Sequence, residues 1–143
     1  MDEIGVSYVV RPTGVREDRV LPGPELPAAL CALALKKARA ACSAMLTAPP
    51  LRSHRAGTVI AADTIVEHRG RILGKPRNAR EAFTMISGLS GNTHRVWTAV
   101  AIIARRNGAG AHAAVAAVSS LVHARRLPRE RIRAYVESGE WRG

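Results

Sequence analysis

The sequence predicts a single α/β domain that comprises all 143 residues, 1–143. Three observations lead to this class. Short runs rich in β-branched residues have the length of strands, residues 25–46 have the Ala- and Leu-rich composition of a long helix, and Gly- and Pro-containing turns separate the segments. Apolar residues make up 47% of the chain, which is enough for one core, and the length leaves no room for two ordinary domains.

The first half of the chain predicts two strands and one helix. Residues 4–10 read as a short strand, and a Gly- and Pro-rich loop follows it up to Pro24. The helix over residues 25–46 is stopped by Pro49 and Pro50. The continuous apolar run over residues 58–62 predicts a strand buried on both faces, continuing to Val66.

The second half predicts a hairpin followed by further strands and helices. The turn His68-Arg69-Gly70-Arg71 leads into residues 72–76, a pattern typical of a β-hairpin. Asn78 is a good N-cap, and Glu81 stands three residues later, as in a capping box, so a helix is expected over 79–86. Two strands and a short helix complete the prediction, over residues 93–104, 113–124 and 128–136.

The charge favours an anionic partner without identifying it. Lys and Arg number 22 against 11 Asp and Glu, a net charge of +11, and 19 of the basic residues are Arg. Such a balance suits a nucleotide or a nucleic acid. No apolar run reaches the roughly 18–20 residues of a membrane span, and the first residues lack the pattern of a signal peptide. We therefore expect a cytoplasmic protein that does not bind membranes.

Asp63 is the first candidate for chemistry. It follows the apolar run over residues 58–62, where a carboxylate is costly unless it is paired, hydrogen-bonded or bound to a metal. Ligands of α/β proteins gather where strands end. Asp63 is therefore either a structural residue that caps a turn or a functional carboxylate, acting as a metal ligand or as a general base.

Two lysines and a glutamate are further candidates. Lys37 shares a helical face with Leu26, Leu30 and Leu33, so its ammonium group either extends to water or reaches an anion site. Lys75, between Gly74 and Pro76, is either a solvated turn residue or a phosphate contact. Glu17 in the loop is, by itself, typical of solvated surface.

Several separate segments together resemble the Maf family of nucleoside triphosphate pyrophosphatases. They read Val-Ile-Ala-Ala-Asp-Thr-Ile-Val at 59–66, Gly-Arg-Ile-Leu-Gly-Lys-Pro at 70–76, Leu-Ser-Gly-Asn-Thr-His-Arg-Val at 89–96 and Tyr-Val-Glu-Ser-Gly-Glu-Trp at 135–141. The resemblance extends over nearly the whole chain. It implies an α/β fold of the inosine-triphosphate-pyrophosphatase type, with helices flanking an elongated mixed sheet and a central cleft.

The resemblance also implies a reaction and roles for named residues. A nucleoside triphosphate is cleaved between its α and β phosphates, to the monophosphate and pyrophosphate, with a divalent cation, Mg²⁺ or Mn²⁺. Asp63 matches the proton acceptor for the attacking water and, with Glu17, the metal site. Lys37 and Lys75 match lysines that face the phosphates. Thr64 matches the position associated with the branch that prefers dTTP and UTP.

The resemblance has departures at both ends of the chain. A Ser-x-Ser-Pro-Arg-Arg segment would precede Ile4, and further elements would follow Trp141, so the domain is expected to lack elements at both ends and to have weak or absent activity. The family resemblance also implies a homodimer. The alternative function is that of a catalytically degenerate relative, which binds nucleotides or nucleic acid in a regulatory role. No specific nucleic-acid partner is expected, because aromatic residues are only 3% of the chain.

Overall fold

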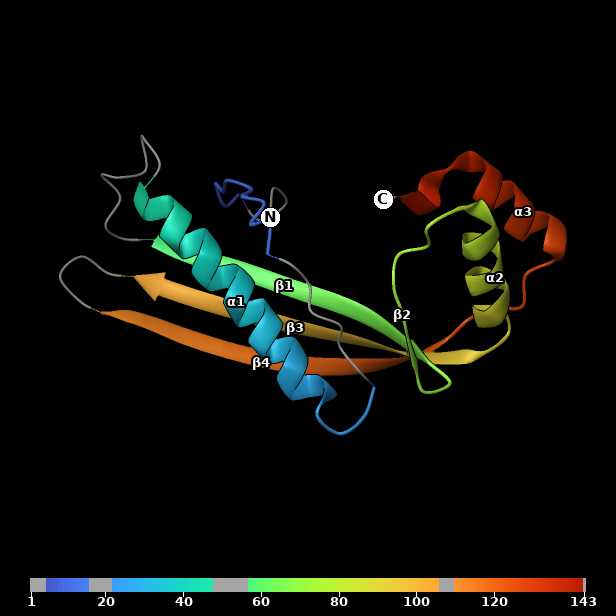
Figure 1. Ribbon diagram of the computed structural model, residues 1–143, viewed down its shortest axis with the longest axis horizontal. Helices are drawn as coiled ribbons and strands as arrows, with labels where there is room; N and C mark the ends of the chain where they lie inside the picture. The colour runs from blue at the N-terminus through green and yellow to red at the C-terminus, as the bar shows by residue number, and fades with distance from the viewer. Residues whose placement is uncertain (1–4, 16–21, 48–56, 106–109, 143) are drawn as a thin grey trace.

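The computed structural model describes residues 5–15, 22–47, 57–105 and 110–142, which form a long sheet with one helix across it and two helices at one end (Figure 1). The elements follow one another as α1 (Leu26–Thr47), β1 (Gly57–His68), β2 (Arg71–Leu73), α2 (Ala79–Leu89), β3 (Thr93–Arg105), β4 (Ala111–His123), α3 (Arg129–Ser138) and the short 3₁₀ helix η3 (Glu140–Arg142).

The sheet has the strand order β2-β1-β3-β4, and all of its pairs are antiparallel. The α/β class and the elongated sheet are confirmed. Among the strands that the structure describes there is no parallel pair, so the sheet is not mixed within this part of the chain. In the same part, no helix is long and apolar enough to cross a membrane.

The core lies between α1 and one face of the sheet. Leu26, Leu30 and Leu33 on α1 are at most 7% exposed, as their helical spacing predicts. They pack against a small-residue surface on β3, where Ala99 and Ala101 are fully buried. Alternation along each strand sends every second side chain to this face, which we call the helix-facing side. On β1 it comprises the odd-numbered residues from Val59 onward.

The opposite face of the sheet is exposed in the described part of the chain. Ile60, Ile102 and Val118 are 51%, 39% and 64% exposed on it. The prediction that the strand around residues 58–62 is buried on both faces is therefore wrong. Among the described helices, α1 is the one that packs on β1, and it covers one face of the strand. The continuous apolar run therefore does not indicate a strand covered on both faces.

The predicted hairpin and helices are confirmed, with small shifts at their ends. Arg69 and Gly70 both have positive φ, which gives the two-residue loop a twist that suits a hairpin. Asn78 caps α2 by accepting a hydrogen bond from the Glu81 backbone N–H at 2.9 Å. The Glu81 carboxylate accepts hydrogen bonds from the backbone N–H and the side-chain Nε of Arg77. The hydrogen bond from the Arg77 side chain lowers the pKa of Glu81 below its ordinary value. The other two helices, α2 and α3, pack against each other beyond one end of the sheet (Figure 1).

The strand predicted over residues 4–10 is wrong. Residues 5–10 belong to no helix or strand and are exposed, and Ile4 lies outside the described residues. A β-branched run forms a strand only when a neighbouring strand takes up its backbone N–H and C=O groups. The described strands give residues 5–10 no such partner.

Candidate functional site

Asp63 lies in the middle of β1 on the helix-facing side. Its side chain is 13% exposed, and its cross-strand partner is the fully buried Ala99. The alternative that Asp63 caps a turn is wrong, because β1 continues past it to the hairpin at residues 69 and 70. The carboxylate therefore projects from a rigid strand toward α1 instead of capping a turn.

Lys37 on α1 meets this carboxylate. Its Nζ atom lies 2.6 Å from Asp63 Oδ1, and its side chain is 17% exposed. Lys37 thus reaches the sheet instead of extending to water, because its place on the apolar stripe of α1 directs it downward. The contact holds both side chains between α1 and the sheet, where both charges are largely sheltered from solvent. The structure therefore places a cation and an anion in contact between α1 and the sheet.

The second oxygen of Asp63 is available for chemistry. Among the residues that the structure describes, Asp63 makes one hydrogen bond, through Oδ1 to Lys37. Oδ2 is left as an acceptor on a partly sheltered carboxylate, as a general base or a metal ligand requires. The arrangement can bind an anion through Lys37 and take a proton through Asp63.

Thr64 and Lys75 lie near the same edge of the sheet but do not join the pair directly. The Thr64 side chain lies on the opposite face, where its Oγ1 is 2.9 Å from Thr98 Oγ1. Lys75 is exposed and follows β2, whose pairing with β1 ends at Val66 and Leu73. Described strands therefore leave the edge of β1 unpaired from Gly57 to Ile65.

The unpaired edge of β1 lies close to both Asp63 and Thr64. Asp63 points to one face of β1 and Thr64 to the other, and a ligand can reach both only around the edge. Lys75 comes two residues after β2, the strand that pairs with β1 beyond the unpaired part of this edge. Glu17, the remaining candidate, lies outside the described residues. The structure thus brings Lys37 and Asp63 into contact and leaves Thr64 and Lys75 at the adjoining edge.

The carboxylate of Asp63 suits a divalent ion such as Mg²⁺ that is bound mainly by the phosphates of a substrate. Within the described ranges, no group of three or more His, Cys, Asp and Glu side chains forms a complete protein site. Mg²⁺ is commonly bound by one or two carboxylates together with substrate phosphates, so a single carboxylate such as Asp63 is compatible with it. Its hard oxygen ligand suits Mg²⁺ or Mn²⁺ better than a soft metal.

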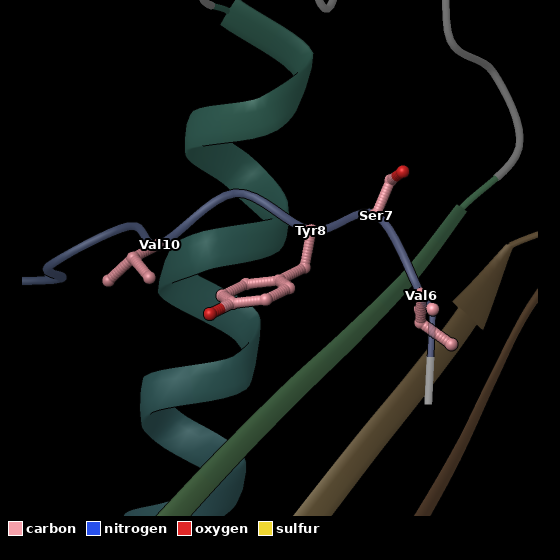
Figure 2. Close-up of a pocket in the computed structure, with 5 residues that line it drawn as sticks. Val6, Ser7, Tyr8 and Val10 are labelled. Carbon is pink, nitrogen blue, oxygen red and sulfur yellow. The ribbon is translucent and has the colours of Figure 1, made fainter. Parts of the chain in front are cut away.

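An open pocket of about 620 Å³ lies elsewhere, on the N-terminal segment (Figure 2). It is lined by Gly5, Val6, Ser7, Tyr8 and Val10. In Figure 2 the Tyr8 ring and the Ser7 side chain point to opposite sides of the segment. No candidate residue is in this lining, so we do not assign the pocket to the site, and the predicted central cleft stays a prediction.

Sequence reasoning missed a polar and aromatic cluster on the helix-facing side. Trp97 donates from Nε1 to Glu67 Oε2 at 3.0 Å, and the Arg95 guanidinium lies 5.7 Å from the centre of the Trp97 ring. The signal was available, because Glu67 follows Asp63 by four residues and therefore points to the same face of β1.

The chain belongs to the family of Maf-like proteins, whose model matches residues 1–143. It is 38% identical over 141 residues to a protein of Anaeromyxobacter sp. (strain Fw109-5) and 39% identical over 137 residues to one of Desulfitobacterium hafniense (strain Y51), covering 98% and 95% of this chain. Both relatives are named dTTP/UTP pyrophosphatase. The matches cover 62% and 58% of these relatives, so the chain spans about three fifths of their length.

Proposed function

We propose that this chain binds a nucleoside triphosphate, dTTP or UTP, and hydrolyses it to the monophosphate and pyrophosphate. The observation that carries the proposal is the contact of 2.6 Å between Lys37 and Asp63. A lysine that binds phosphate beside a carboxylate that takes a proton is the minimum such a hydrolysis needs. The names of the relatives and the family membership support the substrate class.

Lys37 has the first role in the proposed reaction. Its ammonium group, paired with Asp63 before substrate binds, turns to a phosphate oxygen of the triphosphate, which offers more negative charge than one carboxylate. This contact offsets charge that otherwise repels an incoming nucleophile. Asp63 then accepts a proton from a water molecule that attacks the α phosphorus, and the bond to the bridging oxygen breaks to release pyrophosphate.

A divalent cation, Mg²⁺ or Mn²⁺, supplies further neutralisation of the phosphate charge when bound, and Asp63 and Glu17 are the residues that would hold it. Lys75 extends the phosphate contacts along the open edge of β1, as an exposed lysine beyond β2 can do. Thr64 contacts the substrate from the same edge. Its hydroxyl is oriented by the bond of 2.9 Å to Thr98 Oγ1.

Lys37→Gln tests the binding half of this function. The variant keeps a polar side chain of similar reach but removes the charge, and a hydrogen bond to a charged group is worth about 1.5–3 kcal/mol, roughly 10- to 150-fold in Kd. We expect dTTP binding, measured by titration calorimetry with Mg²⁺ present, to weaken by that factor.

Lys36→Gln is the matched control, because Lys36 is the exposed neighbour that points to another face of α1. It removes the same charge from the same helix. A general effect of net charge on nucleotide binding would weaken both variants equally. That result would contradict a specific role for Lys37.

The exposed arginines before and within α3 favour a second function, binding of nucleic acid without turnover. Arg125, Arg126, Arg131 and Arg133 are exposed, and in the described part of the chain none pairs with a carboxylate. This function predicts DNA binding with a steep dependence on salt and no release of pyrophosphate. Pyrophosphate release with little affinity for DNA would instead support the hydrolase.

The cytoplasmic location and the homodimer that the sequence analysis expects both stay predictions.

A further inference from the structure

Trp97 is held in one orientation on the helix-facing side of β3. Its indole N–H donates to Glu67 Oε2 at 3.0 Å, and Arg95 lies over its ring at 5.7 Å from the ring centre. Arg95 is itself held, because its Nη1 donates to Ser119 Oγ at 3.0 Å. A tryptophan with a satisfied N–H and a fixed ring is a rigid surface for another flat group.

The sheet register sets Trp97 beside the Lys37–Asp63 pair. Asp63 pairs with Ala99, and Ile65 pairs with Trp97, so Asp63 and Trp97 are diagonal neighbours on one face. The Cα atoms of such neighbours lie about 7–8 Å apart, within reach of an aromatic side chain. One nucleotide is long enough to extend from a phosphate at Lys37 to a base over Trp97.

Burial decreases along β3 in the direction of Trp97. Ile103, Ala101 and Ala99 are 5% exposed or less under α1, whereas Trp97 is partly buried and Arg95 is exposed. In Figure 1 the sheet continues past α1 before α2 and α3 are reached. Trp97 packs against the cluster that includes Leu26 and Leu30 of α1 but is only partly buried there, so part of the indole stays accessible.

We propose that the accessible part of the Trp97 indole is the surface on which the nucleobase stacks when the triphosphate binds Lys37. This proposal rests on the proposed function and adds the residue that recognises the base. Aromatic rings accept every base through their π faces, so Trp97 contributes affinity for the nucleoside part of the substrate. Glu67 is a positioning residue, since it acts through the indole N–H.

Two ligands separate a stacking role from a merely structural one. dTTP carries a base, and inorganic triphosphate carries the phosphates alone. In Trp97→Leu, which keeps an apolar side chain without a π face, we expect the Kd of dTTP to rise about 5- to 150-fold, while the Kd of inorganic triphosphate stays the same. Trp97→Phe keeps a π face and should restore most of the affinity, and it serves if the Leu variant does not fold.

A fluorescence titration gives an independent readout. Trp97 and Trp141 are the two tryptophans of the chain, so Trp141→Phe leaves Trp97 as the one reporter. We expect dTTP, but not inorganic triphosphate, to quench its emission. Equal loss of affinity for both ligands in the Trp97 variants, or binding of dTTP without any change in Trp97 emission, would overturn the proposal. Failure of both ligands to bind the unmodified chain would instead refute the proposed function, and the stacking proposal with it.

Discussion

Replacement of Asp63 by Asn is expected to lower the rate of pyrophosphate release from dTTP by about 10²- to 10⁴-fold, the usual contribution of a positioned general base. Asn has the shape of Asp, and its amide oxygen can still accept a hydrogen bond from Lys37, so the local packing is retained. Its amide does not take a proton from water. We therefore expect the loss in kcat, with dTTP affinity changed much less.

The matched control is Glu137→Gln, which neutralises an exposed carboxylate on α3 away from the pair. Its rate should equal that of the unmodified chain in a coupled assay of pyrophosphate release. If Asp63→Asn releases pyrophosphate as fast as this control, Asp63 is not the base.

Replacement of Leu30 by Ala is expected to reduce the free energy of unfolding by about 2–5 kcal/mol. Leu30 is fully buried between α1 and the sheet, and its cluster includes Ala99 and Ala101, which are too small to fill the resulting cavity. Chemical denaturation followed by circular dichroism measures the loss as a lower midpoint with an unchanged slope.

Ala32→Ser is the control for this cavity, because Ala32 lies on the exposed side of the same helix. A change there should stay within about 0.5 kcal/mol. A loss below about 1 kcal/mol for Leu30→Ala would mean that α1 does not close the core as described.

The sequence was most informative where spacing alone determines a face. The positions of Leu26, Leu30 and Leu33 predicted the buried stripe of α1, and the same spacing selected Lys37 as unusual. The N-cap at Asn78 and the turn at Arg69 and Gly70 were predictable for the same reason. Capping and tight turns depend on a few neighbouring residues, whose side chains or backbone angles decide the local structure.

The sequence was least informative where a partner decides the outcome. Residues 5–10 have strand composition but no neighbouring strand among those described, and the face of β1 that carries Ile60 has no helix on it. Propensity describes what a segment tolerates, whereas strand pairing and burial depend on segments distant in the sequence. Neither outcome could be read from the residues concerned.

The candidate site shows the same division. Asp63 and Lys37 were each predictable, since one is a carboxylate after an apolar run and the other a lysine on an apolar stripe. Their contact was not, because it depends on how α1 crosses β1. Strand alternation alone implies that Thr64 points away from Asp63, but the open edge of β1 near both became visible only with the sheet order.

We propose above that the Lys37–Asp63 pair directs water to the α phosphorus of a nucleoside triphosphate. ³¹P NMR of the products formed from dTTP with Mg²⁺ tests it most directly, with Asp63→Asn run in parallel. Because weak activity is expected, the incubation is prolonged. We then expect the signals of dTMP and pyrophosphate from the unmodified chain, and none above the spontaneous background from the variant. Signals of dTDP and phosphate, or equal amounts of pyrophosphate from both proteins, would contradict it.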